Sequence, residues 1–256
     1  MKKFISNKYT LISLGIILFI GLWFFCTLIF DKDSMIFPSP IVTFKALIEL
    51  LGVSYTYRCL LISLLKMLIG FAIGLVLAFM TALIVRDNDY LYKLLSPTIT
   101  ALKAVPTAAV VFLFMVLVKS KNAPILLVTL ISYPILYETL VNGIRNIDPQ
   151  IMDAVKLDGT KFSQKVFRIQ LPLALPYLVV GVISSFSLSF KIEIMAEIIT
   201  GYTQDGLGSL IKAVQINDPT NMAAIFAYSF IAVILMILVS IPANILLKKM
   251  TVKLSN

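Results

Sequence analysis

Long apolar runs, separated by short charged segments, set the pattern of this chain. Four runs, at 9–30, 67–85, 169–190 and 219–247, contain no Lys, Arg, Asp or Glu. A bilayer hydrocarbon core of about 30 Å needs about 20 apolar residues in a helix. The membrane spans that these runs predict are 9–30, 59–85, 169–190 and 221–247.

Two further apolar runs contain one charged residue each. The run 94–118 holds Lys103, and the run 122–144 holds Glu138. Both runs are long enough to cross, which predicts six spans within a single membrane domain, 1–256. The alternative is that one of these two runs is re-entrant or interfacial.

The composition agrees with a membrane protein. Hydrophobic residues make up 59% of the chain and charged residues 14%, against about 45–50% and about 25% in soluble domains. This leaves too little polar surface for a water-facing globule, so we expect an all-α membrane protein. The chain has no histidine, and Cys26 and Cys59 lack the spacing of a metal or redox motif. We therefore expect no enzyme activity, no metal and no cofactor bound by this chain.

The basic residues determine the expected orientation. The net charge is +9, but Lys and Arg gather between apolar runs, as the positive-inside rule predicts for cytoplasmic segments, rather than on a nucleic-acid-binding module. Six crossings place both termini on one side, and the segments on that side hold thirteen Lys and Arg against six in the outer segments. We expect a multi-pass protein of a bacterial cell membrane, in contact with lipid, with both termini in the cytoplasm and no nucleic-acid partner.

The segment 145–168 is predicted to be cytoplasmic and longer than a connector requires. Asp148 followed by Pro149 is typical of a helix start. Gly159 suits the left-handed backbone at a helix end. Thr160 can cap a second helix. The segment therefore predicts a short helix, a sharp turn and another helix.

The short helix carries apolar and small side chains at helical spacing, among them Ile151, Ala154 and Val155. Such a face suits docking in the groove of a partner protein. The alternative is a helix that lies flat on the bilayer, held to anionic lipid by its basic side chains. Periodicity alone leaves both interpretations open.

The same stretch resembles a cytoplasmic motif of binding-protein-dependent ABC importer permeases: E-A-A, three residues, G, nine residues, I-x-L-P. Asp replaces the Glu, and Val replaces the second Ala, while the spacing is unchanged. The resemblance implies the type I ABC importer permease fold, with coupling helices that dock on an ATPase. The residues implied in this coupling are Asp153, Ala154, Val155, Leu157, Gly159, Ile169, Leu171 and Pro172.

Shorter matches extend the resemblance to the nitrate, sulfonate and taurine branch of these permeases. They are Pro38-Ser39-Pro40, Lys103-Ala104-Val105-Pro106, and Ala196-Glu197 followed by Gly206-Leu207-Gly208. This implies a translocation path for a small solute: a sulfonate, taurine, nitrate or a vitamin precursor. The implied partners are a second permease copy in a homodimer, a cytoplasmic ATPase dimer that uses the ATP, and an extracellular or periplasmic binding protein. A stand-alone secondary transporter is the alternative.

Charged residues inside or beside spans are the candidates for the path, because such groups are costly in a bilayer and mark functional sites. Lys191, Glu193 and Glu197 form the densest group, with both carboxylates on one helix face. We expect either that they line the outer mouth of the path, together with Lys103, or that they form an interfacial cluster in which Lys191 pairs with a carboxylate.

Overall fold

The computed structural model describes residues 8–30, 37–118, 121–200 and 205–255, and every regular element within these ranges is a helix. Five helical stretches are long and apolar enough to cross a membrane, and one bent helix pair raises the number to six. The spanning helices are α2 (Lys8–Phe30), α4 (Ser54–Val85), α7 (Ala123–Arg145), α10 (Leu171–Thr200) and α12 (Met222–Ser255). The other elements are α3 (Pro40–Leu51), α5 (Asp89–Ala104), α6 (Thr107–Leu117), α8 (Pro149–Leu157), α9 (Phe162–Gln164), the π-helix η1 (Lys165–Gln170) and α11 (Leu207–Asn217).

Helices α5 and α6 form the bent pair, so the predicted span 94–118 is broken in two, and the pair is either one broken span or a re-entrant segment. The two helices meet at 89°. Val105 between them has an extended backbone, with ψ of 129°, because a residue that precedes proline is disfavoured in the helical conformation. The prediction of six spans holds if this pair is taken as one broken span.

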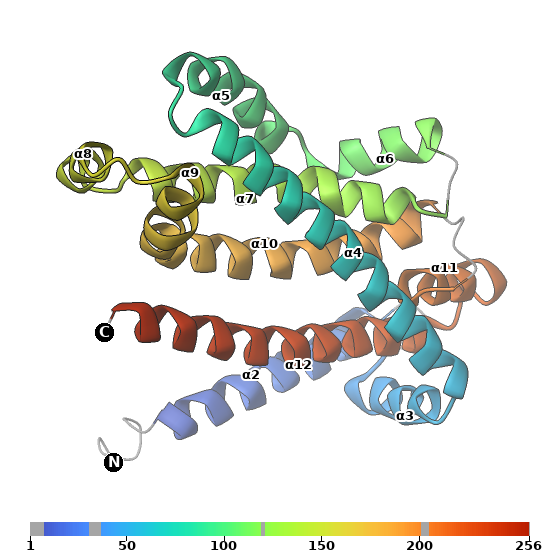
Figure 1. Ribbon diagram of the computed structural model, residues 1–256. Coiled ribbons are helices and arrows are strands. Elements are labelled where there is room, and N and C mark those ends of the chain that lie inside the picture. The colour runs from blue at the N-terminus through green and yellow to red at the C-terminus, as the bar shows by residue number, and fades with distance from the viewer. Residues whose placement is uncertain (1–7, 31–36, 119–120, 201–204, 256) are drawn as a thin grey trace.

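Helix α7 packs against both α4 and α10, and α10 lies between α7 and α12 in Figure 1. Its buried side chains, such as Leu127 and Leu136, form the main core with α4 and α10. Glycines bring the helices close: a Cβ on Gly70 would lie 2.6 Å from the Ile125 carbonyl oxygen, and one on Gly181 would lie 2.4 Å from Thr139 Oγ1. Small residues permit such close helix packing in membranes, where apolar lipid provides no hydrophobic drive for association.

A second group of helices, α2, α3 and α12, is joined by aromatic contacts. The Trp23 ring stacks on Phe230 at a centroid distance of 5.2 Å, and its indole N–H donates to the Pro38 carbonyl at 3.1 Å. Helix α2 otherwise exposes apolar side chains such as Leu18 and Leu28. This is the surface expected of a helix that faces lipid.

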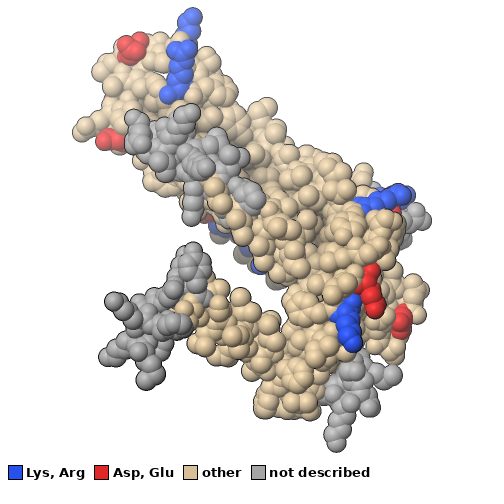
Figure 2. All heavy atoms as spheres, turned by 90° about the horizontal axis from the view of Figure 1, so that it is seen from below, with Lys and Arg blue, Asp and Glu red and all other residues tan. Residues whose placement is uncertain are grey.

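The molecule has two distinct ends. Helix α8 projects at one end, where the first residue of α2 and the last of α12 also lie, while α3 and α11 occupy the opposite end (Figure 1). Most charged side chains on the face seen in Figure 2 lie toward the two ends, and uncharged residues cover most of the surface between them. This distribution fits a bundle that crosses a membrane along its long direction.

The segment after α8 differs from the predicted second helix. Thr160 does not cap it. Lys161 stands at the N-cap position without a side-chain hydrogen bond, and α9 and η1 run directly into α10. The π-helix η1 ends two residues before Pro172, which has no N–H to donate. The segment 145–168 therefore contains one separate helix, α8, followed by the first turns of a spanning helix.

We predict that Gly70→Ala lowers the stability of the bundle. The added methyl meets the backbone of α7, which has to move, and such overpacking costs about 1–3 kcal/mol. The midpoint of thermal unfolding in detergent measures the effect. Gly21→Ala is the control, because a Cβ there meets nothing within 4 Å, and its midpoint should stay unchanged or rise. Equal midpoints for the two variants would contradict the close packing.

Candidate functional site

Helix α8 begins and ends as its sequence predicts. The Asp148 side chain accepts a hydrogen bond from the Gln150 N–H at 2.8 Å, and Pro149 stands in the first turn. Gly159 follows the helix with φ of +64°, a left-handed conformation that glycine adopts without steric cost. The predicted cap and the predicted turn are both confirmed.

No side chain of α8 is buried. Leu157 is 90% exposed, and Ile151 and Phe162 are also exposed. Asp153 pairs with Lys156 at 3.0 Å. Both residues belong to α8, so this ion pair does not connect the helix to the bundle. An isolated helix with uncovered apolar side chains presents a surface that a partner protein or the membrane interface can cover.

The remaining motif residues lie at the base of this segment rather than on α8. Ile169, Leu171 and Pro172 are half-buried at the junction of η1 and α10. The motif therefore has two structural parts, an exposed helix and a partly buried root that enters the bundle.

A group of contacts, here called the Arg86 cluster, fastens this root to the end of α4. It consists of Arg86, Asp87, Phe162, Lys165 and Gln170. The buried Arg86 guanidinium donates to Gln170 Oε1 at 2.6 Å and to Asp87 Oδ2 at 3.0 Å, and it lies 4.5 Å from the centre of the Phe162 ring. Lys165 pairs with Asp87 at 3.1 Å. Charge-assisted hydrogen bonds of this kind are stronger than neutral ones.

Sequence reasoning missed the Arg86 cluster. Gln170 occupies the unspecified position of I-x-L-P, so the motif contained no signal for it. Arg86 counted only as one more basic residue in a short turn. A charged residue directly after a long apolar run was the one available indication. Behind α8, the cluster borders a polar cavity of about 760 Å³, whose lining includes Arg86, Asp87, Asp89, Arg145, Met152, Lys156 and Lys165.

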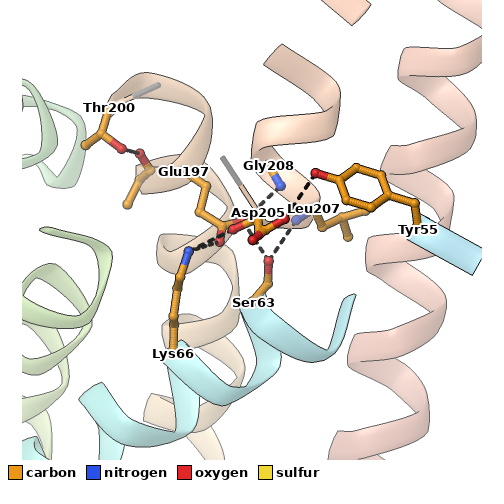
Figure 3. Close-up of polar contacts among 9 residues, drawn as sticks. Tyr55, Ser63, Lys66, Glu197, Thr200, Asp205, Leu207 and Gly208 are labelled. Carbon is orange, nitrogen blue, oxygen red and sulfur yellow. Dashed lines mark hydrogen bonds and ion pairs between the residues drawn. The ribbon is translucent and has the colours of Figure 1, made fainter. Parts of the chain in front are cut away.

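At the opposite end lies a second group of contacts, the Glu197 cluster (Figure 3). It consists of Ser63, Lys66, Glu197, Leu207 and Gly208. The fully buried Glu197 carboxylate accepts hydrogen bonds from Ser63 Oγ at 2.7 Å, Lys66 Nζ at 3.1 Å and the Gly208 N–H at 2.9 Å. The Ser63 hydroxyl also accepts from the Leu207 N–H at 2.8 Å.

The Glu197 cluster caps α11 from outside that helix. Leu207 and Gly208 are its first residues, whose N–H groups have no partner within the helix. Glycine is required here because a Cβ on Gly206 would lie 2.1 Å from Glu197 Oε1 and one on Gly208 would lie 2.5 Å from the Ile194 carbonyl oxygen. The G-L-G sequence therefore allows α11 to approach α10.

The structure separates the other candidate path residues. Lys191 is exposed beside a groove between α10 and α12, and it makes no ion pair within the described ranges. The predicted pairing of Lys191 with a carboxylate is therefore wrong, since Lys66 pairs with Glu197. Glu193 is fully buried, and both of its oxygens lack a hydrogen-bond partner among the described residues. Lys103 forms an ion pair with Glu138.

The fold and these two ends define a helical membrane transport subunit. The chain belongs to the family described as binding-protein-dependent transport system inner membrane component, which matches residues 70–254. It is thus a multi-pass inner-membrane permease of a binding-protein-dependent ABC importer. The family is a class of transport permeases, not of enzymes, and it works with ATPase and binding-protein partners. This membership excludes the alternative of a stand-alone secondary transporter.

The chain is similar to several curated permeases. The putative aliphatic sulfonates transport permease protein SsuC of Bacillus subtilis is 25% identical over 190 residues, which cover 74% of this chain and 68% of that protein. The riboflavin transport system permease protein RibX of Chloroflexus aurantiacus is 27% identical over 163 residues, 62% of this chain and 60% of that protein. The glycine betaine/proline betaine permease ProW of Escherichia coli is 26% identical over 120 residues, 46% of this chain and 33% of that protein.

Solved structures show the same fold. The MetNI methionine ABC transporter in an inward-facing conformation has a TM-score of 0.61 at 20% identity, covering 77% of this chain and 94% of that chain. An amino acid ABC transporter solved with histidines has a TM-score of 0.60 at 15% identity, covering 78% of this chain and 94% of that chain. The predicted type I ABC importer permease fold is confirmed.

We predict opposite effects from two similar substitutions on α10. Glu197→Met leaves Lys66, Ser63 and the α11 N–H groups without their partner, and breaking a buried ion pair in this way costs about 3–5 kcal/mol. Glu193→Met removes an equally buried carboxylate that has no hydrogen-bond partner in the described ranges, so stability should stay the same or rise. Thermal unfolding in detergent compares the two variants. Equal losses would show that the Glu197 cluster does not hold this end together.

Proposed function

We propose that α8 is the coupling helix of this permease and that it docks in a groove of a separate ATPase subunit. The observation that carries the proposal is that no side chain of α8 is buried, with Leu157 90% exposed at its last turn. Asp153, Ala154 and Val155 share this helix, and Gly159 sets the direction in which the chain returns. A helix in a groove buries such side chains as anchors.

The contacts at the base of α8 support a mechanical role. Closure of the ATPase dimer on ATP would displace α8. The Arg86 cluster joins the segment that follows α8 to the end of α4, and the same segment continues into α10. Because α4 and α10 pack on α7 through close glycine contacts, the three helices would move as one body. Rigid-body rotation of this kind is a common way to open and close a site.

The proposed orientation places α8 and both termini in the cytoplasm. The distribution of Lys and Arg favours this side by the positive-inside rule, and the described ends of α2 and α12 lie at the α8 end (Figure 1). The permease would function as a homodimer, with an external binding protein at the α3 and α11 end. ATP would be used by the partner ATPase, and this chain would bind no cofactor.

The transported solute is proposed to be a small organic molecule or anion: a sulfonate, taurine, nitrate or a vitamin precursor. The relatives support this range, since they are named for aliphatic sulfonates and riboflavin. A betaine permease is also among them. The external binding protein would select the solute before it reaches the path.

We predict that Leu157→Asp separates the permease from its ATPase. A charge in place of an anchor side chain should reduce the ATPase recovered with the tagged permease at least tenfold, about 1.4 kcal/mol in binding free energy. The measurement is copurification from membranes. Ile216→Asp is the control, because Ile216 is also exposed but lies on α11 at the opposite end. Undiminished ATPase recovery with Leu157→Asp would favour a helix that lies on lipid.

We predict that position 159 needs a backbone conformation rather than a particular side chain. Gly159→Asn should keep ATP-driven uptake near its original rate, because Asn tolerates the left-handed conformation. Gly159→Val should lose most of the uptake while the protein still reaches the membrane, since a β-branched residue is strained at φ of +64°. Uptake by membrane vesicles and the amount of permease present are both measured. Equal uptake by the two variants would remove the turn from the coupling mechanism.

A further inference from the structure

The ion pair between Lys103 of α5 and Glu138 of α7 is exposed within the spanning region. The side chains are 39% and 45% exposed. The Lys66–Glu197 pair, in contrast, is 16% and 0% exposed. The Lys66–Glu197 pair is enclosed by protein, whereas the Lys103–Glu138 pair faces outward from this chain.

The exposed pair lies away from the α8 end of the bundle. Glu138 lies seven residues before Arg145, the end of α7, which is about 10 Å along the helix axis. Lys103 lies 14 residues after Asp89, the start of α5, which is about 21 Å along that axis. Charged groups at such positions face the bundle interior or a water-filled cavity, because hydrocarbon does not solvate them.

Polar side chains continue from the pair toward the α8 end. Tyr92, Ser96 and Thr100 recur every fourth residue on α5, so they share one face of that helix. With Glu138 and Asn142 of α7 they line a small hollow. The polar seam, defined as Ser96, Thr100, Lys103, Glu138 and Asn142, therefore follows the contact between the two helices. Helix α2 shows the contrasting surface, with exposed Leu, Ile and Phe side chains.

Beyond the pair, the seam meets the bend between α5 and α6. A cavity of about 170 Å³ opens there, lined mainly by apolar side chains and by Lys103, Thr107 and Pro134. Val105 and Pro106 separate α5 from α6, and Pro134 lies inside α7 one turn before Glu138. Irregular backbone at membrane depth is tolerated where it lines a cavity or is buried in protein. The pair thus stands between a polar hollow on one side and an apolar cavity on the other.

We propose that the Lys103–Glu138 pair lines the water-filled solute path and acts as its charge filter. This inference rests on the proposed transport function and assigns two residues of the path. The acidic group of a passing solute replaces the Glu138 carboxylate as the partner of Lys103. Anions that do not replace it are repelled by the negative charge of Glu138. The neighbouring apolar cavity takes the uncharged part of the solute. The filter favours small organic solutes with a carboxylate or sulfonate group.

Thiol reactivity tests the inference without knowledge of the solute. The background is the full chain, expressed with its ATPase, in which Cys26 and Cys59 are replaced by Ala. Single cysteines are introduced as Lys103→Cys, Glu138→Cys, Thr100→Cys and Leu18→Cys. Open membrane fragments expose both faces to an anionic sulfonatoethyl or a cationic trimethylammonioethyl methanethiosulfonate. These reagents react with thiolates, which form readily only in water.

We expect Thr100→Cys, which retains the ion pair, to react with both reagents at least tenfold faster than the apolar, lipid-facing control Leu18→Cys. Glu138→Cys leaves Lys103 unpaired. The ratio of the anionic to the cationic reaction rate should therefore be about tenfold higher at position 138 than at position 100, a difference of about 1.4 kcal/mol. Lys103→Cys leaves Glu138 unpaired and should favour the cationic reagent by a similar factor.

Two results would overturn the proposal. If Thr100→Cys reacts as slowly as Leu18→Cys, the seam is covered by lipid or by a second copy and is not a path. If all three seam positions react rapidly but without charge preference, water reaches the seam and no filter exists there. Thiol rates do not depend on ATP-driven transport. Failure here is therefore distinct from failure of the coupling proposal, which is read from ATPase recovery with Leu157→Asp.

Discussion

The inability of a hydrocarbon environment to hydrogen-bond polar groups is the constraint on which this structure depends. Every backbone donor and acceptor in a spanning segment needs a partner within the protein, which accounts for the helical architecture. Because apolar lipid also removes the hydrophobic drive between helices, association relies on close packing. Gly70 and Gly181 supply that packing where α7 meets α4 and α10. The same constraint makes every charged side chain in the bundle informative, since each requires either a partner or water.

Helix α4 connects the two polar clusters of the molecule. Lys66 belongs to the Glu197 cluster and Arg86 to the Arg86 cluster, and Arg86 follows Lys66 by 20 positions, about 30 Å along a helix. Helix α10 takes part in the same two clusters, through Glu197 near its end and through η1 at its beginning. The two helices are thus fastened to each other at both ends, with α7 packed against both of them. These contacts connect the α8 end of the molecule to the α11 end through α4 and α10.

The two ion pairs of the spanning region have different physical roles. The pair of Lys66 and Glu197 is enclosed, and its remaining hydrogen-bonding capacity is used to cap α11, which is the arrangement that makes a buried ion pair tolerable. The pair of Lys103 and Glu138 has exposed side chains at the bend of a broken helix pair. The first pair fits a structural role, and the second fits a surface that meets water. Glu193 fits neither description, because its carboxylate is buried without a hydrogen-bond partner among the described residues.

The amino-acid sequence alone determined the helical membrane class, the start of α8 at Asp148 and the turn at Gly159, because these follow from the length of apolar runs and from local backbone preferences. The resemblance in the segment 153–172 led to the importer family for the same reason: it is a pattern of neighbouring residues. Tertiary structure alone decided which polar side chains meet. Lys66 and Glu197 are 131 residues apart in the chain, and Arg86 and Gln170 are 84 apart, so no local pattern connects them. The break between α5 and α6 was predictable only in part. Pro106 marks the place in the sequence, but a proline is compatible with either a kink or a full bend, and only the tertiary structure shows which one forms.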